Sequence, residues 1–143
     1  MEIGKLIEDR AGSQIVSASG DMPVREAIAL LAAKRIGAIP VMNGDAVIGI
    51  FSERDVVYRL AGEGELCLTR PLAEVMTAPP ISVKPTNTVL DALALMTKRR
   101  IRHLPVIDGD AMCGFISIGD LVKARLDEIE HEAEALRTYI QTA

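Results

Sequence analysis

The chain has 143 residues, a length that suits one ordinary domain or two very small units that share a core. Hydrophobic residues make up 49% and charged residues 25%, with a net charge of −4, which is typical of a globular protein and excludes a disordered or strongly basic one. No apolar run approaches the roughly 18 residues of a membrane helix, and the first residues do not resemble a signal peptide. With two Phe, two Tyr and no Trp, the chain is poorly equipped to stack nucleic-acid bases.

The first half of the chain predicts one small mixed unit. Residues 1–12 form a short leading helix, and residues 15–19 a strand. Residues 23–35 carry apolar side chains at helical spacing, and Pro23 suits a first helical turn. A hairpin of residues 38–42 and 46–51 follows, with Asn43-Gly44-Asp45 as its turn, and a second helix begins at Ser52.

The second half repeats this order. A shift of 65 positions superposes residues 36–41, Ile-Gly-Ala-Ile-Pro-Val, on residues 101–106, Ile-Arg-His-Leu-Pro-Val, without a gap. A strand over 81–84, a helix over 88–100, a hairpin of 103–107 and 111–116 and a helix from Ser117 are expected. Thr88 and Asp91 match a capping box. Identical residues at this shift include Ala27/Ala92, Arg35/Arg100, Gly44/Gly109, Gly49/Gly114, Ser52/Ser117 and Asp55/Asp120.

These elements predict an α+β protein of two tandem β-α-β-β-α units. We assign residues 1–12 to the leading helix, 13–62 to the first unit, 63–77 to a linker, 78–126 to the second unit and 127–143 to a helical extension. Each unit has fewer than 60 residues, which is too few for a comfortable core of its own. We therefore expect the two units to pack face to face with pseudo-two-fold symmetry.

The repeated pattern resembles the cystathionine-β-synthase-like (CBS) domain, and the tandem resembles a CBS pair, or Bateman module. The resemblance rests on the Val-x-(Glu/Asp)-Ala helix, the x-x-(Ile/Leu)-Pro-Val strand, the Gly-Asp turn and the Gly-x-x-Ser-x-x-Asp motif, each present twice. The resemblance covers roughly residues 13–126, and the chain is similar to the stand-alone bacterial CBS pairs. It implies a regulatory module that binds adenosine-containing ligands in clefts between the units.

The Ser-x-x-Asp motif is where chemistry is expected. In both copies a strand ends and a helix begins, so that a hydroxyl and free N–H groups point out of the helix N-terminus, which favours a phosphate or sugar oxygen. Asp55 and Asp120 lie one turn in, where a carboxylate can accept hydrogen bonds from two vicinal hydroxyls. The same spacing also describes a plain helix cap, with Ser52 or Ser117 as the N-cap residue.

The resemblance assigns further positions to the ligand. It implies that the x-x-(Ile/Leu)-Pro-Val strands edge the adenine and that the first strands supply apolar walls, although a core role is the more ordinary reading of each apolar residue. The expected ligand-binding residues are Ser17, Ile39, Pro40, Ser52, Arg54, Asp55, Ile81, Arg102, His103, Leu104, Pro105, Ser117 and Asp120. Ile15, Val16 and Val83 are further candidates for the walls.

Charge separates the two units. Residues 13–62 carry five basic and five acidic side chains, whereas residues 78–126 carry seven and four, a net charge of +3. Arg102 and His103 hold two positions from which family members contact phosphate, and Gly37 and Ala38 hold them in the first unit. The second unit is therefore the expected phosphate binder, with Arg54 as partial compensation in the first. A solvated helix end is the preferred role of Lys98 and Arg99.

Other chemistry is not indicated. Cys67, Cys113, His103 and His131 supply no zinc ligand set and no nucleophile–base pair, and no Gly-x-Gly-x-x-Gly follows a strand. Cys113 is expected to be buried in its strand. We expect a reduced, cytoplasmic protein that is no enzyme, holds no metal and binds neither nucleic acid nor a membrane.

The last helix carries an apolar stripe at heptad spacing. The stripe predicts a homodimer, and the alternative is a helix that lies back on its own module. Its residues are Val122, Leu126, Ile129, Ala133, Leu136 and Ile140.

Two functions remain open. The first is a nucleotide sensor for AMP, ADP, ATP or NAD(H) that acts on an unknown protein partner. The second is a dimeric adaptor whose clefts are empty. S-adenosylmethionine is a weaker candidate ligand because it has no phosphate to meet the basic cluster.

Overall fold

A computed structural model describes residues 1–10 and 14–142. The first unit contains strand β1 (Ala18–Ser19), helix α2 (Val24–Lys34), strands β2 (Ala38–Asn43) and β3 (Ala46–Ser52) and helix α3 (Glu53–Glu63). β1 pairs in parallel with β2, and β2 pairs antiparallel with β3, which gives a three-stranded sheet. The strand expected over residues 15–19 is thus only two residues long.

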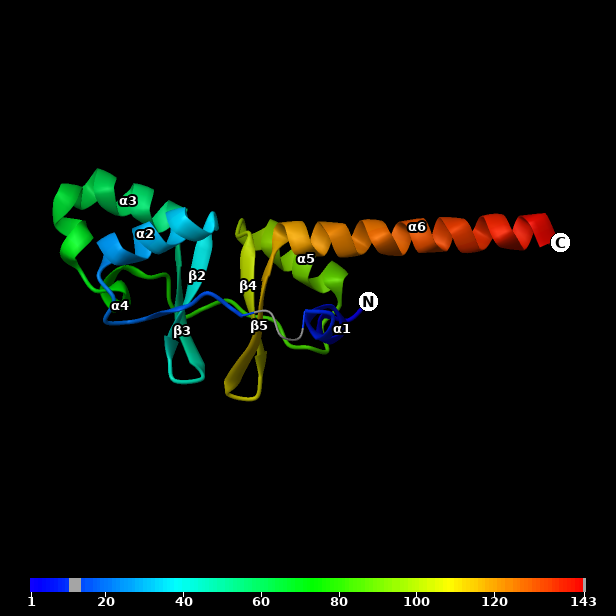
Figure 1. Ribbon diagram of the computed structural model, residues 1–143, viewed down its shortest axis with the longest axis horizontal. Helices are drawn as coiled ribbons and strands as arrows, with labels where there is room; N and C mark the ends of the chain where they lie inside the picture. Colours follow the sequence, from blue (N-terminus) through cyan, green and yellow to red (C-terminus); the bar gives the residue numbers. More distant parts are fainter. Residues whose placement is uncertain (11–13, 143) are drawn as a thin grey trace.

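The second unit repeats the order with helix α5 (Val89–Arg99), strands β4 (His103–Asp108) and β5 (Ala111–Ser117) and helix α6 (Ile118–Thr142). The strand expected over residues 81–84 is wrong. Only Val83 forms a bridge, in parallel to Val106, because its N–H and carbonyl are the groups that bond to β4. The β-α-β-β-α order of the second unit therefore begins with a single bridge. The two hairpins lie side by side (Figure 1), joined where the N–H of Met112 donates to the carbonyl of Asp45 at 3.1 Å.

The first helices of the two units begin and end at equivalent residues. Pro23 and Thr88 are the N-cap residues, and the expected capping box of Thr88 and Asp91 is confirmed, with the Asp91 N–H donating to Thr88 Oγ1 at 3.0 Å. Both helices end at an arginine in the left-handed region, Arg35 at φ 53° and Arg100 at φ 55°. This conformation is more often that of glycine and stops each helix before its central strand.

The hairpins share their turns and one irregularity. Gly44 and Gly109 have positive φ in the turns, as expected. The pairing of β4 with β5 shifts between Val106 and Ile107, and that of β2 with β3 shifts at the equivalent place. Cys113 is the unpaired residue of the second bulge, and because a bulge breaks the alternation of faces it is exposed, contrary to the expectation of a buried cysteine.

Two short segments outside the units complete the hydrophobic cores. Helix α1 (Ile3–Glu8) places Ile3 and Leu6 in the core of the second unit, and helix α4 (Leu72–Val75) places Leu72 and Val75 in the core of the first. The leading helix expected over 1–12 is therefore six residues long, and residues 11–12 lie outside the described part. Neither segment is a passive leader or linker.

Glycines allow these segments to approach the hairpins. A Cβ atom on Gly114 of β5 would lie 2.7 Å from Ile7 Cγ2, and one on Gly49 of β3 would lie 2.8 Å from Met76 Cγ. Such distances are too short for carbon atoms. The repeated glycine of the Gly-x-x-Ser-x-x-Asp motif thus has a packing role that the sequence alone did not indicate.

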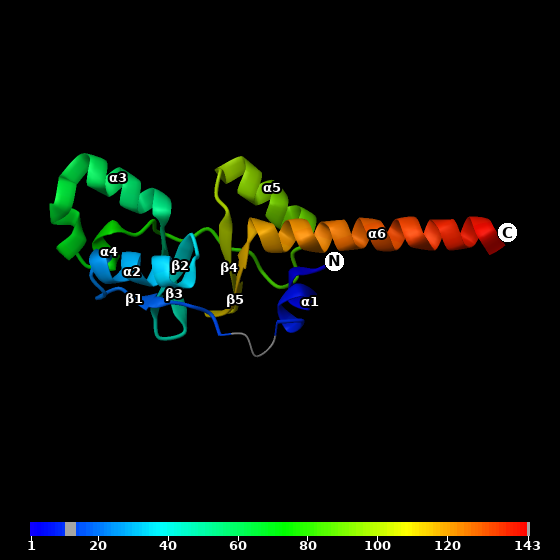
Figure 2. The ribbon, with the colours of Figure 1, turned by 45° about the horizontal axis from the view of Figure 1, so that its top comes forward.

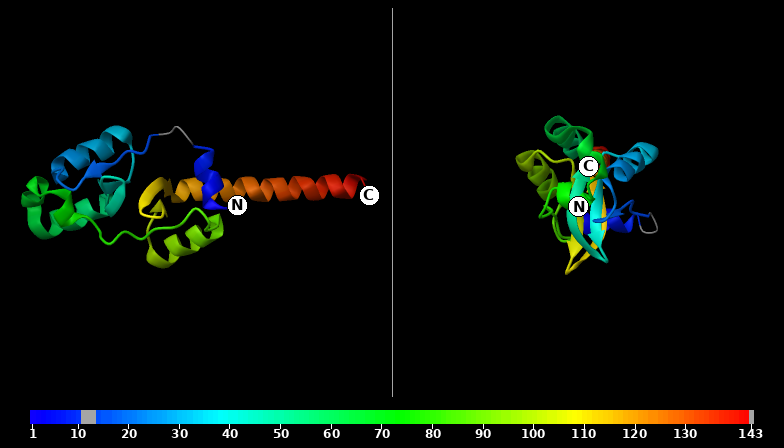
Figure 3. Two further views of the ribbon diagram at one scale, coloured as in Figure 1. Left: turned by 90° about the horizontal axis from the view of Figure 1, so that it is seen from below. Right: turned by 90° about the vertical axis from the view of Figure 1, so that its left-hand side faces the viewer.

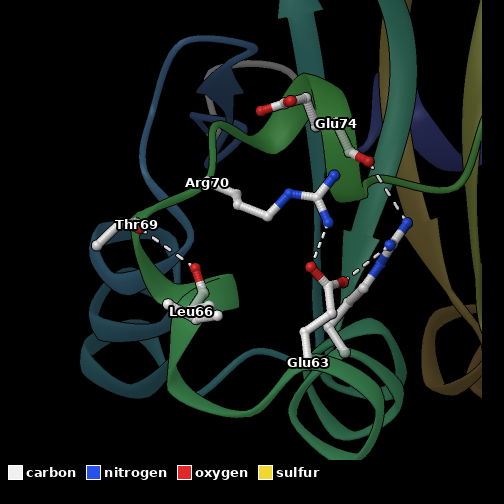
Figure 4. Close-up of polar contacts among 6 residues, drawn as sticks. Glu63, Leu66, Thr69, Arg70 and Glu74 are labelled. Carbon is white, nitrogen blue, oxygen red and sulfur yellow. Dashed lines mark hydrogen bonds and ion pairs between the residues drawn. The ribbon is translucent and has the colours of Figure 1, made fainter.

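The polypeptide after α3 is held by polar contacts (Figure 4). The 3₁₀ helix η1 (Gly64–Thr69) follows α3, and the Glu63 carboxylate pairs with Arg59 at 3.0 Å and with Arg70. Hydrogen bonds from both guanidinium groups hold the pKa of Glu63 below its ordinary value. Cys67, in η1, is fully buried. This cluster joins the end of the first unit to α4.

Helix α6 leaves the body of the molecule. Figures 1, 2 and 3 show its C-terminal part extending alone beyond the other elements. Leu121 and Ala124 are its buried residues, and every residue from 129 to 142 is exposed. The alternative in which this helix lies back on its own module is therefore wrong. Within residues 1–10 and 14–142, no helix is both long and apolar enough to cross a membrane.

Candidate functional site

Two clefts lie between the units, and the 65-residue shift relates their linings. The first cleft has a volume of about 430 Å³. Its lining joins the first unit's Ser-x-x-Asp motif to the start of β4 in the second unit. It consists of Gly37, Ala38, Ile50, Ser52, Glu53, Arg54, Asp55, Tyr58, Thr77, Pro80, Ile81, Ile101, Arg102 and His103.

The motif of the first cleft forms a helix cap. The Ser52 N–H donates to Asp55 Oδ2 at 2.8 Å, and the Ser52 hydroxyl lies 3.2 Å from the same oxygen. Thr77 Oγ1 donates to the other carboxylate oxygen, Oδ1, at 2.9 Å. Ser52 and Asp55 thus form the helix cap that the sequence allowed as an alternative. A carboxylate offers about four acceptor positions, so Asp55, which is half-buried at the cleft, retains capacity for a ligand hydroxyl.

The basic residues of the first cleft come from both units. Arg102 and His103 enter from the second unit, where the carbonyl of Arg102 accepts a hydrogen bond from the Ile118 N–H at 2.8 Å. Arg54 enters from the first turn of α3, and its Nη1 donates to the carbonyl of Arg100 at 2.9 Å. Arg54 therefore ties α3 to the end of α5 across the cleft.

This arrangement changes which site is suited to phosphate. Arg102 of the second unit lies in the cleft of Ser52 and Asp55 of the first unit, whereas His103 lines both clefts. The expectation that Arg102 and His103 of the second unit contact a phosphate stays a prediction, and the structure places both residues opposite the first unit's motif. The reason is that the β4 start faces across the interface, so each cleft takes its motif from one unit and its opposite wall from the other.

The second cleft is smaller, about 320 Å³, and contains the other Ser-x-x-Asp motif. The Ser117 N–H donates to Asp120 Oδ2 at 2.8 Å, and the Asp120 N–H donates to Ser117 Oγ at 3.2 Å. The lining consists of Ile7, Arg10, Gln14, Ile15, Val16, Ile36, Ala38, His103, Cys113, Gly114, Phe115, Ser117 and Asp120.

Arg10 forms an ion pair with the carboxylate of the second cleft. Its guanidinium forms an ion pair with Asp120 through both nitrogens, with Nη1 3.0 Å from Oδ2. Burial acts to raise the pKa of Asp120, but the hydrogen bonds from Arg10 and Ser117 outweigh it and hold that pKa below its ordinary value. A hydroxyl that approaches Asp120 must therefore compete with an internal cation, whereas the donors to Asp55 among the described residues are the neutral groups of Ser52 and Thr77.

His103 lines both clefts. Its ring stacks on Phe115 with centroids 5.7 Å apart and an interplanar angle of 12°. Burial lowers the pKa of His103, against the opposing charges of Asp120 and Glu53, and so favours the neutral ring. A phosphate placed beside it would favour the charged form.

Five expected ligand residues lie outside both linings. Ser17 is exposed before β1, and the four residues Ile39, Pro40, Leu104 and Pro105 are buried within β2 and β4. Because side chains alternate along a strand, Ala38 and His103 face the clefts while Ile39 and Leu104, both with no exposed surface, face the cores. Ile81, Ile15 and Val16 do line the clefts as apolar walls.

Other lining residues were missed by the sequence analysis. Tyr58 lies one turn after Asp55 on α3, a position that helical spacing could have indicated. Thr77 and Arg10 come from segments assigned to the linker and the leading helix, and no local motif marks them. The described residues include no group of three or more His, Cys, Asp or Glu side chains placed to hold a metal ion.

The chain belongs to the CBS-domain family, whose model matches residues 7–62 and 72–127. It is 31% identical over 115 residues to the CBS domain-containing protein YhcV of Bacillus subtilis, an alignment that covers 80% of this chain and 81% of that protein. It is 36% identical over 126 residues to the mitochondrial CBS domain-containing protein CBSX3 of Arabidopsis thaliana. That alignment covers 85% of this chain but 61% of CBSX3, so the chain spans less than two thirds of that relative.

Solved structures agree with the fold. The crystal structure of a CBS-domain-containing protein from Agrobacterium tumefaciens is 36% identical and superposes with a TM-score of 0.80, covering 87% of this chain and 99% of that one. The expected class, a tandem CBS pair of mixed α and β structure, is thus confirmed.

Proposed function

We propose that this protein is a regulatory module that binds an adenosine-containing ligand with at least one phosphate in the first cleft. The observation that carries the proposal is the joining, in one cleft, of a carboxylate and a helix N-terminus from one unit with Arg102 and His103 from the other. The N-terminus of α3 favours an anion, the cations attract phosphate, and Asp55 can accept from ribose hydroxyls.

The walls of the first cleft suit the rest of such a ligand. Ile50, Ile81 and Ile101 supply aliphatic surface for a purine ring, and Tyr58 lies at the same cleft. The volume of about 430 Å³ falls within the range of small-molecule sites, roughly 300–1,000 Å³. Because both units line the cleft, a ligand there would favour one relative arrangement of the units and so alter the surface shown to a partner protein.

Fold relatives bind compounds of this kind. The structure of CBSX2 in complex with AMP is 22% identical with a TM-score of 0.74, and the CBS pair of MJ0100, 18% identical with a TM-score of 0.75, was solved with 5′-methylthioadenosine and S-adenosylmethionine. These complexes support an adenosine ligand in general. The cations of the first cleft favour AMP, ADP, ATP or NAD(H) over S-adenosylmethionine, which has no phosphate.

A dimeric adaptor with unoccupied clefts is the second candidate. It is favoured by the capping boxes, which engage Asp55 and Asp120 without any ligand. The two candidates differ in whether the aspartates do anything beyond capping.

A thermal-shift panel with AMP, ADP, ATP, NAD⁺, NADH and S-adenosylmethionine separates these candidates. A ligand at about 100 times its dissociation constant stabilises the fold by about 2.7 kcal/mol, or about 5–10 °C at this size. We expect Asp55→Ala to abolish the shift given by a phosphate-bearing nucleotide. Asp91→Ala is the matched control, because it removes the same kind of capping box from α5, away from both clefts.

The control makes the outcomes distinct. Both variants lose about 1 kcal/mol of cap stability, but only Asp55→Ala should lose the ligand response. If no compound shifts the wild type at millimolar concentration, the adaptor replaces the sensor. If Asp55→Ala responds as Asp91→Ala does, the ligand binds without the Asp55 carboxylate, which contradicts the proposed role of Asp55.

A further inference from the structure

Helix α6 carries an apolar stripe that is largely exposed along its length. Val122, Leu126, Ile129, Leu136 and Ile140 are 44%, 58%, 45%, 60% and 66% exposed, and Ala133 between them is exposed as well. An isolated helical segment of this length is marginal in water without tertiary contacts. A helix that leaves the body with such a stripe therefore needs a cover.

The spacing of the stripe is that of a coiled coil. The six residues follow one another at alternating steps of four and three, which assigns Leu126, Ala133 and Ile140 to a positions and Val122, Ile129 and Leu136 to d positions. Leu121 and Ala124, the buried residues of α6, lie on a different face of the helix. The stripe thus faces away from its own module and is open to a partner helix.

The charges beside the stripe select the partner and its direction. In a parallel pair in register, a g residue lies beside the e residue five positions later in the partner. Arg125 at g would meet the partner's Glu130, and Glu132 at g would meet the partner's Arg137. Each contact occurs twice by symmetry, and all four join opposite charges.

The antiparallel arrangement that overlaps the whole stripe is unfavourable. When Ile129 is placed opposite Ala133, Glu130 faces the partner's Glu130 and Glu132 faces the partner's Glu132. Lys123 then faces the partner's Arg137. Like charges at such positions destabilise a coiled coil and specify against that orientation.

We propose that α6 forms a parallel, in-register, two-stranded coiled coil with a second copy of this chain. The two-fold axis then runs along α6, and the two CBS modules lie at the same end of the coil. This assembly does not depend on the proposed ligand. It goes beyond that function, since it gives the part of α6 outside the module a role of its own.

Disulfide trapping tests the orientation and register. Ala133→Cys is made in a Cys113→Ser background, because Cys113 is exposed while Cys67 is buried. In the parallel coil the two introduced thiols face each other at one core layer, so mild oxidation should yield a covalent dimer. Ala135→Cys, an exposed position outside the stripe, is the matched control and should remain uncrosslinked.

Charge exchange tests the selection of the partner. Glu132→Arg and Arg137→Glu should each weaken the dimer about tenfold in sedimentation equilibrium, because each turns two attractive contacts into repulsive ones. The double variant should restore wild-type affinity. All these sites are exposed, so the fold of the module is unaffected and circular dichroism of each variant should match the wild type.

Three results would overturn the coiled coil. They are a monomeric chain at concentrations of hundreds of micromolar, equal crosslinking of Ala133→Cys and Ala135→Cys, and a double charge variant no tighter than the single ones.

Discussion

Individual residues make the two clefts unequal. The first cleft has Arg54, Arg102 and His103 beside Asp55, whose carboxylate accepts from neutral groups of Ser52 and Thr77, whereas Asp120 in the second cleft is already paired with Arg10. At the positions where the first cleft has Arg102 and His103, the repeat has Gly37 and Ala38. The clefts are related by sequence repetition, but their charges suit different occupancies.

Removal of Arg10 should open the second cleft. We expect Arg10→Ala to raise the affinity of this cleft for adenosine several-fold, because ribose hydroxyls then meet a free Asp120 carboxylate. The ion pair is partly exposed, 44% on Arg10 and 20% on Asp120, so the loss in unfolding free energy should stay below about 1 kcal/mol. Isothermal titration with adenosine measures this in an Asp55→Ala background. A lower affinity would instead assign Arg10 to the ligand.

His103 should make stability depend on pH. Burial lowers its pKa in the folded protein, so the unfolded chain takes up the proton first as the pH falls. The contribution of neutral His103 to the free energy of unfolding is complete above the ordinary histidine pKa of about 6.5 and is lost as the pH falls below that value. Urea unfolding between pH 8 and pH 5 should show that the free energy of unfolding changes less steeply with pH in His103→Gln than in the wild type. A His103→Gln protein whose free energy of unfolding depends on pH as steeply as that of the wild type would contradict this prediction.

At the scale of elements, the short helices α1 and α4 complete the cores of the second and the first unit, respectively. Ile3 of α1 is fully buried among residues of the second unit, and Leu72 of α4 is fully buried among those of the first. The backbone supports the same connection, since the Ile3 N–H donates to the carbonyl of Asn87 at 2.8 Å and the Leu72 N–H to that of Met22 at 2.9 Å. A unit cut at the boundaries of the repeat would lack part of its core.

Shortening the side chains of Ile3 and Leu72 should therefore destabilise the fold as much as a core mutation does. We expect Ile3→Ala and Leu72→Ala each to lower the free energy of unfolding by about 2–5 kcal/mol, measured by urea denaturation. Leu66→Ala is the control, because Leu66 in η1 is 77% exposed and should change it by less than about 0.5 kcal/mol. A loss below 1 kcal/mol for Ile3→Ala would show that α1 is only loosely attached.

Periodicity predicted the regular elements well because their causes are local. Helices α2 and α5 end within a residue of the expected bounds, since proline, the Thr88 capping box and the left-handed arginines act over a few positions. The first strands were overestimated because their apolar residues line a cleft instead of pairing. The contribution of Arg102 to the opposite cleft, and that of Arg10 to Asp120, depend on contacts distant in sequence, which no local pattern contains.

At the scale of the whole molecule, the two proposals assign separate roles to the body and to α6. The two units share the clefts, so an occupied cleft would act on the arrangement of the body, and α6 would bring two such bodies together. The proposed function depends most on the first cleft, where a phosphate is expected to contact Arg102 and His103 of the second unit.

The ratio of AMP affinity to adenosine affinity tests that expectation most directly. Isothermal titration should show that wild-type protein prefers AMP and that Arg102→Ala removes most of this preference, about tenfold, while adenosine binding is retained. Arg99→Ala, in the last turn of α5 and outside both clefts, should keep the wild-type ratio. An Arg102→Ala protein that still prefers AMP as strongly as the wild type would contradict the assignment of the phosphate to this cleft.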